Sequence, residues 1–177
     1  MTPTGSRVFL AAPYSQWMDP STGLVETRFR ERLDRLRRGF LDRGAQVFSA
    51  HHNEQWGAGW LPAEECTPAD FQAMRVADVV CAVIGSPPSG GVAVELGWAS
   101  ALGKPILVVT DEGGACTPMI RGIHTVTRAA FVTAGPDWTD AFADTVIDAT
   151  LALVRDGGGA PYRTGDPGPG YVTAAGA

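Results

Sequence analysis

Short apolar runs alternate along the chain with longer segments in which apolar residues recur every three or four positions. A short run bounded by turn residues is typical of a buried strand, and the three-to-four spacing is typical of a helix with one buried face. The runs predict five strands, at residues 7–12, 45–50, 78–85, 104–111 and 129–134. The longer segments predict four helices, at 29–44, at 67–77, from the loop 85–91 to about 103, and at 137–156.

The order of these elements predicts an α/β fold. Strands and helices alternate, and the central strands are continuously apolar, as in a parallel sheet that is buried on both faces. We therefore expect one domain over residues 1–156, built as a doubly wound, five-stranded parallel sheet of the flavodoxin or Rossmann kind. Residues 157–177 are rich in Gly and Pro without any period, which predicts a mobile tail.

Composition and charge exclude several classes of function. The net charge is −5, so we expect no nucleic-acid partner, because binding to a phosphate backbone needs a basic face. No apolar run approaches the roughly 20 residues that cross a membrane, and the first residues lack the pattern of a signal peptide. We expect a cytoplasmic protein. The three cysteines are too scattered to predict a disulfide framework or a zinc site, and we expect no metal.

The loop 85–91 is the first candidate for chemistry. In a doubly wound sheet, ligands bind beyond the carboxyl ends of the strands, and this loop follows the third strand. It ends in Ser89, Gly90 and Gly91 immediately before a helix, where backbone N–H groups favour an anion such as a phosphate. The alternative is an ordinary turn with a helix cap. The loop is not a P-loop, since no Gly-Lys-Ser/Thr follows, and it is not a GxGxxG fingerprint.

Two carboxylates accompany this loop. Glu95 lies about one turn into the following helix among apolar neighbours, and Asp70 lies near the start of the predicted helix 67–77, for which Thr67 is the expected N-cap. Either acid could simply complement the dipole of its helix. Two carboxylates beside one anomeric carbon would instead suit glycosyl chemistry, with one as nucleophile and one as acid and base. Asp78, at a helix-to-strand junction, is expected to be structural.

Several motifs together resemble the nucleoside 2-deoxyribosyltransferase superfamily, and within it the nucleoside 5′-monophosphate N-glycosidases. They are VFLAAPY at 8–14, Asp70 followed by ADVV at 77–80, and SGGVAVELGWA at 89–99 followed by GKP. DPSTG at 19–23, AH at 50–51 and EQWG at 54–57 further resemble the CMP hydrolases of peptidyl-nucleoside antibiotic pathways. The resemblance covers residues 7–111.

The resemblance implies a hydrolase that needs no cofactor. Glu95 matches the family nucleophile, which attacks C1′ and forms a covalent ribosyl-enzyme intermediate. Asp70 matches the acid and base that assists departure of the base and then activates water. The products implied are free base and ribose 5-phosphate.

The resemblance also implies how the nucleotide is held. Ser89 and Gly91 match the loop that binds the 5′-phosphate, and Thr117 is the candidate for a hydroxyl that reaches the phosphate from a neighbouring subunit. His51 matches a histidine on the substrate side. We therefore expect a homodimer or a larger homo-oligomer, with a small-molecule nucleotide as the substrate.

The sugar and the base have their own candidates. Phe9 stands where deoxyribonucleotide enzymes of this family carry Tyr, whose hydroxyl would crowd the 2′-OH, so a ribonucleotide is expected. Tyr14, Ser15, Trp17 and Trp56 are expected to line the base pocket. The tryptophans of the loops, Trp17, Trp56 and Trp60, could stack on a base or could equally pack the loops down. Ser15 replaces the Arg of the relative that cuts hydroxymethyl-CMP, which disfavours that base and leaves CMP or a purine monophosphate such as GMP.

Two other functions stay open at this stage. A transferase would pass the ribosyl group to another base instead of water. A nucleotide-binding module would hold the ligand without turnover, although the presence of both Glu95 and Asp70 favours an enzyme.

Overall fold

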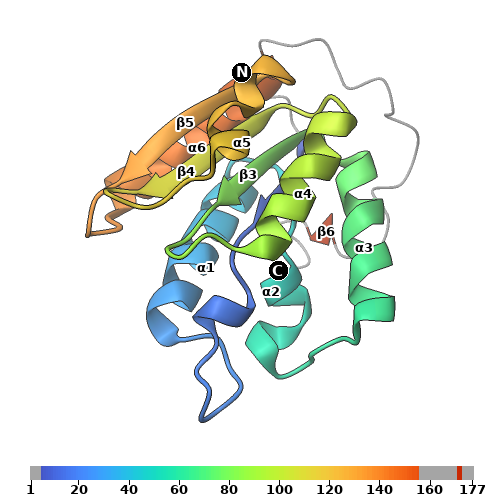
Figure 1. Cartoon of the computed structure of the whole chain (residues 1–177), viewed down its shortest axis with the longest axis vertical. Coiled ribbons are helices and arrows are strands. Elements are labelled where there is room, and N and C mark those ends of the chain that lie inside the picture. Colours follow the sequence, from blue (N-terminus) through green and yellow to red (C-terminus); the bar gives the residue numbers. More distant parts are fainter. Residues whose placement is uncertain (1–4, 156–170, 173–177) are drawn as a thin grey trace.

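The computed structural model of the chain describes residues 5–155 and 171–172, and its centre is a single six-stranded sheet (Figure 1). The strand order is β5-β4-β3-β1-β2-β6. The first five strands are parallel to their neighbours, and β6 pairs antiparallel with β2. The strands are β1 (Arg7–Ala11), β2 (Gln46–Phe48), β3 (Val79–Val83), β4 (Ile106–Asp111), β5 (Ala129–Ala134) and β6 (Tyr171–Val172).

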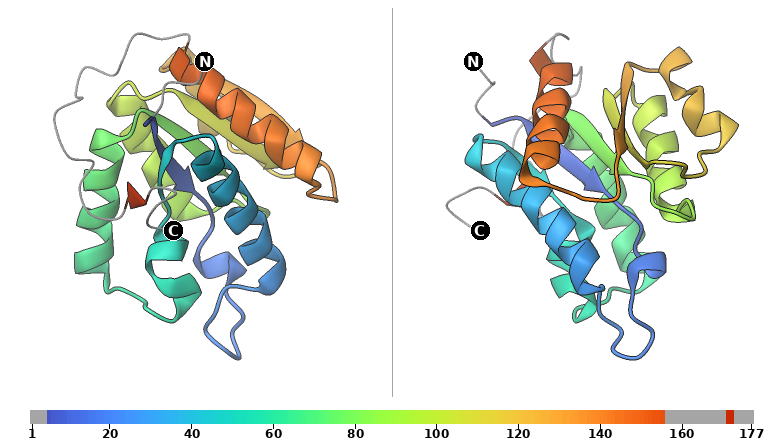
Figure 2. Two further views of the ribbon diagram at one scale, coloured as in Figure 1. Left: turned by 180° about the vertical axis from the view of Figure 1, so that it is seen from behind. Right: turned by 90° about the vertical axis from the view of Figure 1, so that its left-hand side faces the viewer.

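Helices cover both faces of the sheet. Figures 1 and 2 show α1 and α6 on one face and α3 and α4 on the other. The α-helices are α1 (Thr27–Asp42), α2 (Ala50–Asn53), α3 (Ala63–Val76), α4 (Gly90–Ala101), α5 (Pro118–Arg121) and α6 (Asp140–Arg155). Three short 3-10 helices lie at η1 (Ser15–Trp17), η2 (Gln55–Gly57) and η3 (Ile123–Thr125). Over the described ranges, none of the helices has both the length and the apolar character needed to cross a bilayer.

The continuous apolar runs arise because each central strand is buried on both sides. Along β1, Val8 and Leu10 belong to the core beneath α1 and α6, whereas Phe9 and Ala11 belong to the core beneath α3 and α4. Since successive side chains of a strand point to opposite faces, both sets of positions must be apolar. The predicted doubly wound, five-stranded parallel sheet is therefore confirmed for β1 to β5.

Two buried polar side chains bind backbone at the amino-terminal edge of the sheet. The Asp78 carboxylate accepts a hydrogen bond from the backbone N–H of Arg7 at 2.8 Å, which confirms its structural role. Lys104, 1% exposed, donates to the carbonyl oxygens of Arg75 and Ala77 at 2.7 and 2.8 Å. Lys104 thereby satisfies carbonyls that the C-terminal end of α3 leaves without a partner inside the helix.

The start of α3 was predicted wrongly. The helix begins at Ala63 rather than after Thr67, and Pro68 lies inside it. Thr67 is therefore not an N-cap. Pro68 lacks an N–H, so the carbonyl of Glu64 loses its helical hydrogen bond, but Glu64 is exposed and water can satisfy that carbonyl. One consequence is that Asp70 lies in the middle of α3 and not in its first turn.

Other boundaries differ in smaller ways. The second strand ends at Phe48 instead of residue 50, because Ala50 already begins α2. The segment 157–177 falls outside the described residues except for β6, which adds a sixth strand that the sequence pattern did not predict.

The loops after β1 and β3 meet above the centre of the sheet. These two strands are neighbours, although β2 and its helices lie between them in sequence, so they form the switch point at which ligands bind in such folds. Gly85 has φ +77°, and a Cβ there would lie 2.4 Å from Cγ of Pro13. Only glycine allows this close approach, which brings residues 12–14 and 84–91 to the same place.

Candidate active site

A pocket lies at the switch point and is walled by the loops after β1 and β2, by α3 and by the start of α4. Its lining residues are Leu10, Ala12, Tyr14, Ala50, His51, Glu54, Trp60, Leu61, Cys66, Asp70, Ser89, Gly91, Val92 and Glu95. Six of the eleven site residues expected from the sequence are therefore brought together: Tyr14, His51, Asp70, Ser89, Gly91 and Glu95.

Helices α3 and α4 bring the two acids into this pocket. Figure 1 shows the two helices side by side, and the rings of Phe71 and Trp98 make an edge contact between them with centroids 5.2 Å apart. Asp70 precedes Phe71, and Glu95 lies one turn before Trp98, so both carboxyls are held at the level of this contact. Both acids are partly buried. Because Asp70 is in mid-helix, the alternative that it serves the helix dipole is wrong.

The two carboxyl groups are also coupled electrostatically. Burial raises the pKa of Asp70 to about 7, and the nearby charge of Glu54 contributes further. Burial raises the pKa of Glu95 well above its usual value, and the charge of Asp70 adds to this rise. Like charges that share a poorly solvated pocket disfavour double ionisation, so the pair retains a proton near neutral pH.

The start of α4 supplies the backbone donors of the site. Ser89 is buried, and its Oγ accepts a hydrogen bond from the backbone N–H of Val92 at 3.4 Å, so the hydroxyl acts as the N-cap. Gly90 and Gly91 form the exposed first turn, and no neighbouring atom would crowd a Cβ at Gly90. The backbone N–H groups of this turn are accessible to an anion that enters the pocket.

His51 is neutral and fixed. Its Nε2 lies 2.9 Å from the carbonyl oxygen of Pro13, which can only accept, so Nε2 carries the proton and donates. Burial lowers the pKa of His51 to about 4. The imidazole also stacks on the ring of Tyr14, with centroids 4.6 Å apart. His51 thus joins the loops after β1 and β2 and offers Nδ1 as an acceptor.

Five expected site residues do not line the pocket. Phe9 is buried in the core beneath α3 and α4, where its ring stacks on Phe48 at 5.1 Å. Ser15 is exposed on η1, and Thr117 is exposed as the N-cap of α5. Trp56 lies beneath the guanidinium of Arg30, and Trp17 is buried with its ring stacked on that of Phe29.

Seven residues that line the pocket were not among the candidates from the sequence: Leu10, Ala12, Ala50, Glu54, Leu61, Cys66 and Val92. Trp60, one of the loop tryptophans that could stack on a base, also lines it. Trp60 is 58% exposed, and its ring meets the ring of Tyr14 edge-on at 5.1 Å. Trp56 has φ 59°, in the left-handed region, and this turn separates Trp56 from Trp60. Glu54 was visible as a carboxylate within the EQWG motif, but only the fold shows that it enters the pocket.

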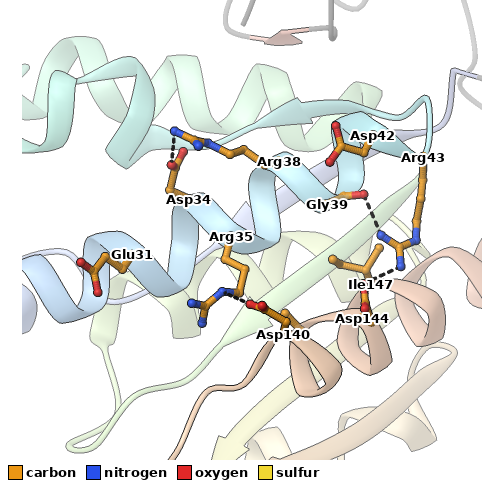
Figure 3. Close-up of a pocket in the computed structure, with 11 residues that line it drawn as sticks. Glu31, Asp34, Arg35, Arg38, Gly39, Asp42, Arg43, Asp140, Asp144 and Ile147 are labelled. Atoms are coloured by element: carbon orange, nitrogen blue, oxygen red, sulfur yellow. Dashed lines mark hydrogen bonds and ion pairs between the residues drawn. The ribbon is translucent and has the colours of Figure 1, made fainter.

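A larger hollow between α1 and α6 has a different character. Figure 3 shows that charged side chains of both helices line it and pair with one another. Arg35 pairs with Asp140 at 2.8 Å, and Arg43 pairs with Asp144 at 2.7 Å. These pairs hold α6 against α1 and leave no convergent reactive groups. Within the described ranges, no three His, Cys, Asp or Glu side chains gather as metal ligands would.

A flavodoxin-like sheet whose switch-point pocket holds a carboxyl pair beside a helix N-terminus defines the class of protein: a doubly wound α/β domain with a candidate active site at its switch point. The sequence profile of the nucleoside 2-deoxyribosyltransferase family matches residues 8–148, and the chain belongs to that family. The resemblance seen in the motifs is thus confirmed. A search of curated proteins gave no significant match.

Several solved structures are similar to this chain in fold, and some also in sequence. The solution structure of BlsM is 36% identical with a TM-score of 0.74 and covers 92% of this chain and 99% of its own. The CMP N-glycosidase BcmB of Clostridium botulinum is 26% identical with a TM-score of 0.60, covering 81% and 99%. A flavodoxin-like domain from Synechococcus, 14% identical with a TM-score of 0.50 and covering 84% and 96%, shares the fold alone. The family and these neighbours support an enzyme that transfers or hydrolyses glycosyl groups.

The raised pKa of Asp70 makes a prediction about stability. A carboxyl whose pKa is higher in the folded state than in the unfolded chain loses stability as pH rises, here between about 4 and 7. Asp70→Asn removes this loss. We expect the variant to melt roughly 3 °C above the wild type at pH 8 and to show little difference near pH 4. Calorimetry at both pH values measures this.

Asp137→Asn removes an exposed carboxylate away from the pocket and serves as the control. An equal gain at both pH values for Asp70→Asn, or the same pH-dependent gain for Asp137→Asn, would contradict the electrostatic account of the pair.

Proposed function

We propose that this protein hydrolyses the N-glycosidic bond of a nucleoside 5′-monophosphate and releases the free base and ribose 5-phosphate. One observation carries the proposal: Asp70 and Glu95 line the same pocket as Ser89 and Gly91 at the start of α4. The arrangement offers a nucleophile, an acid and an anion site within the reach of one small nucleotide.

The first step would form a bond between the enzyme and the sugar. The Glu95 carboxylate attacks C1′ of the ribose as the bond from C1′ to the base nitrogen breaks. The proton of Asp70 passes to the departing base, whose negative charge would otherwise oppose the reaction. The products of this step are a neutral base, a glutamyl-ribosyl ester and ionised Asp70.

The second step would release the sugar. Asp70, now a carboxylate, takes a proton from a water molecule as the water oxygen bonds to C1′. The ester bond to Glu95 breaks, which restores the Glu95 carboxylate and the protonated Asp70. Ribose 5-phosphate leaves, and the pair returns to its starting state with one shared proton.

The coupling of the two acids suits this cycle. One proton must stay on the pair at neutral pH. Burial raises both pKa values, with a further rise from the charge of Glu54 at Asp70 and from the charge of Asp70 at Glu95. The productive distribution places that proton on Asp70. Positive charge that develops at C1′ favours the ionised form of Glu95 and therefore that distribution.

The 5′-phosphate would bind at the start of α4. The exposed N–H groups of Gly90 and Gly91 and the positive end of the helix dipole favour a dianion there. A phosphate fixed at this point positions C1′ for Glu95, which lies about one turn further along the helix. Thr117 is exposed and lies outside its own chain's pocket, so we propose that it serves the phosphate in the partner subunit of a homodimer or larger homo-oligomer.

The base would lie against the aromatic side of the pocket. Tyr14 and Trp60 present ring surfaces, and Glu54 and His51 offer hydrogen-bond acceptors. Acceptors suit a base that carries amino groups, such as cytosine or guanine. CMP and GMP are therefore the first substrates to test. Because the motifs resemble the CMP hydrolases of peptidyl-nucleoside antibiotic pathways, we also propose a role in nucleoside-antibiotic biosynthesis.

The assay compares nucleoside 5′-monophosphates, with the released base separated by chromatography. We expect at least one ribonucleotide to release base, and we expect Glu95→Gln to lower kcat/KM by about 10³-fold or more, because the amide is a poor nucleophile. Glu64→Gln, at the exposed start of α3, is the matched control and should retain full activity.

Absence of base release from every monophosphate would refute the proposal. Exchange of one base for another without free ribose 5-phosphate would identify a transferase instead.

The identity of the sugar depends on Phe9. Its ring is buried in the core that also holds Val92 and Leu96, the neighbours of Glu95 on α4. We propose that a hydroxyl added there by Phe9→Tyr extends toward Glu95 and the 2′ position and shifts preference from CMP toward dCMP. The ratio of the two kcat/KM values measures this preference.

Phe48→Tyr adds the same hydroxyl to the ring that stacks on Phe9 and is the control for general damage to the core. If both variants leave the ratio unchanged, or change it equally, Phe9 does not select the sugar.

A further inference from the structure

A second pocket lies beside α1 and contains an arginine with unused hydrogen-bonding capacity. Arg37 is 4% exposed, and its nearest carboxylate partner is Asp34, at 3.6 Å from Nη1. Asp34 is closer to Arg38, at 2.8 Å. Within residues 5–155, Nε and Nη2 of Arg37 have no hydrogen-bond partner.

These two nitrogens form one edge of the guanidinium group. Their N–H bonds point in the same direction, at the spacing that matches two oxygens of a phosphate or carboxylate. A buried guanidinium with two unpaired N–H groups is unfavourable, because the protein has removed water without replacing its hydrogen bonds. A ligand that supplies the missing oxygens would remove this cost, and because both nitrogens are inaccessible to solvent, its binding requires the Arg37 side chain to shift toward the pocket.

Other groups around Arg37 favour an anion at the same place. The pocket has a volume of about 480 Å³ and is lined by three arginines (Arg30, Arg37 and Arg38) and two aspartates, which leaves an excess of positive charge. His52 also lines it, and its Nδ1 lacks a hydrogen-bond partner within the described ranges. Three nitrogens without partners, two from Arg37 and one from His52, thus belong to side chains of one pocket.

The remaining wall suits an organic group attached to the anion. The guanidinium of Arg30 lies over the Trp56 ring at 5.3 Å, and His52 meets that ring edge-on at 6.2 Å. A pocket of this volume exceeds the needs of a bare ion. Several guanidinium groups around one site are typical of phosphate recognition.

We propose that this pocket is a second ligand site, which binds the phosphate group of a small phosphorylated metabolite through Arg37 and His52. The site is separate from the proposed active site. His51 and Glu54 line the active-site pocket, whereas His52 and Trp56 line the second pocket. Residues 50–57 therefore form the wall between the two, and the site stands whether or not the protein cleaves nucleotides.

Adjacent histidines allow the two pockets to be observed separately. The chain has three histidines, so their imidazole resonances can be resolved and assigned by NMR in the full-length protein. His51 reports on the active-site pocket, His52 on the second pocket, and exposed His124 on general effects of the medium. Inorganic phosphate is titrated at constant pH and at an ionic strength held constant with chloride.

We expect the His52 resonances to shift saturably with phosphate, whereas acetate at the same concentrations produces at most a much weaker response. Arg37→Gln and Arg37→Met should each weaken the His52 response by about tenfold or more, since each removes both donors of the edge. Arg35→Gln removes a charge from the same helix on the side that pairs with Asp140 and should preserve the response within about twofold.

Thermal melting of the variants gives a second measurement. Phosphate should raise the melting temperature of Arg35→Gln by more than that of Arg37→Met, because a ligand stabilises only a chain that binds it. A wild-type His52 signal that does not saturate with phosphate would overturn the proposal. So would an unchanged affinity in both Arg37 variants, or a response to acetate as strong as that to phosphate. These outcomes are independent of whether any nucleotide releases its base.

Discussion

The proposed chemistry of the site depends most on the placement of two carboxyl groups in one poorly solvated pocket. Burial raises the pKa of both Asp70 and Glu95, the charge of Asp70 raises that of Glu95 further, and this arrangement lowers the stability of the fold at neutral pH. It persists because α3 and α4 are fixed beside one another by the ring contact between Phe71 and Trp98. Lys104 adds to this by binding the last carbonyls of α3 from the start of β4. The packing of the domain thus stabilises an electrostatic arrangement that the two side chains alone would not adopt.

The switch point of the sheet explains why the remaining parts of the site meet there. Adjacent parallel strands end on the same edge, so the loops after β1 and β3 must share limited space. Gly85 permits close contact with Pro13. The carbonyl oxygen of Pro13 in turn accepts a hydrogen bond from Nε2 of His51, which follows β2. Three loops that are distant in sequence are thereby joined by one tight contact and one hydrogen bond. The N-terminus of α4 opens into the space they enclose.

Hydrophobic patterning was sufficient to predict the parallel sheet and its order of elements, because strands buried on both faces leave unmistakable apolar runs. It also predicted that Ser89 and Gly91 lie at the start of one helix, α4, and that Glu95 lies about one turn further along it. Patterning failed where the backbone conformation decides which way a side chain points. The left-handed φ of Trp56 directs its ring away from the pocket, whereas the ring of Trp60 lines the pocket. Thr67 was mistaken for an N-cap, because α3 begins at Ala63 and tolerates Pro68 within an exposed turn. The entry of Glu54 into the pocket depends on tertiary packing that no local pattern records.

The central claim is that the two carboxyls act in sequence on opposite faces of one anomeric carbon, with Glu95 as the attacking group. The stereochemistry of the product tests this most directly. When CMP, or whichever monophosphate is cleaved, reacts in water containing methanol, a double displacement must return the β configuration of the substrate. The account predicts methyl β-ribofuranoside 5-phosphate as the trapped product, identified by proton NMR. Formation of the α anomer, or of a mixture of both, would contradict it.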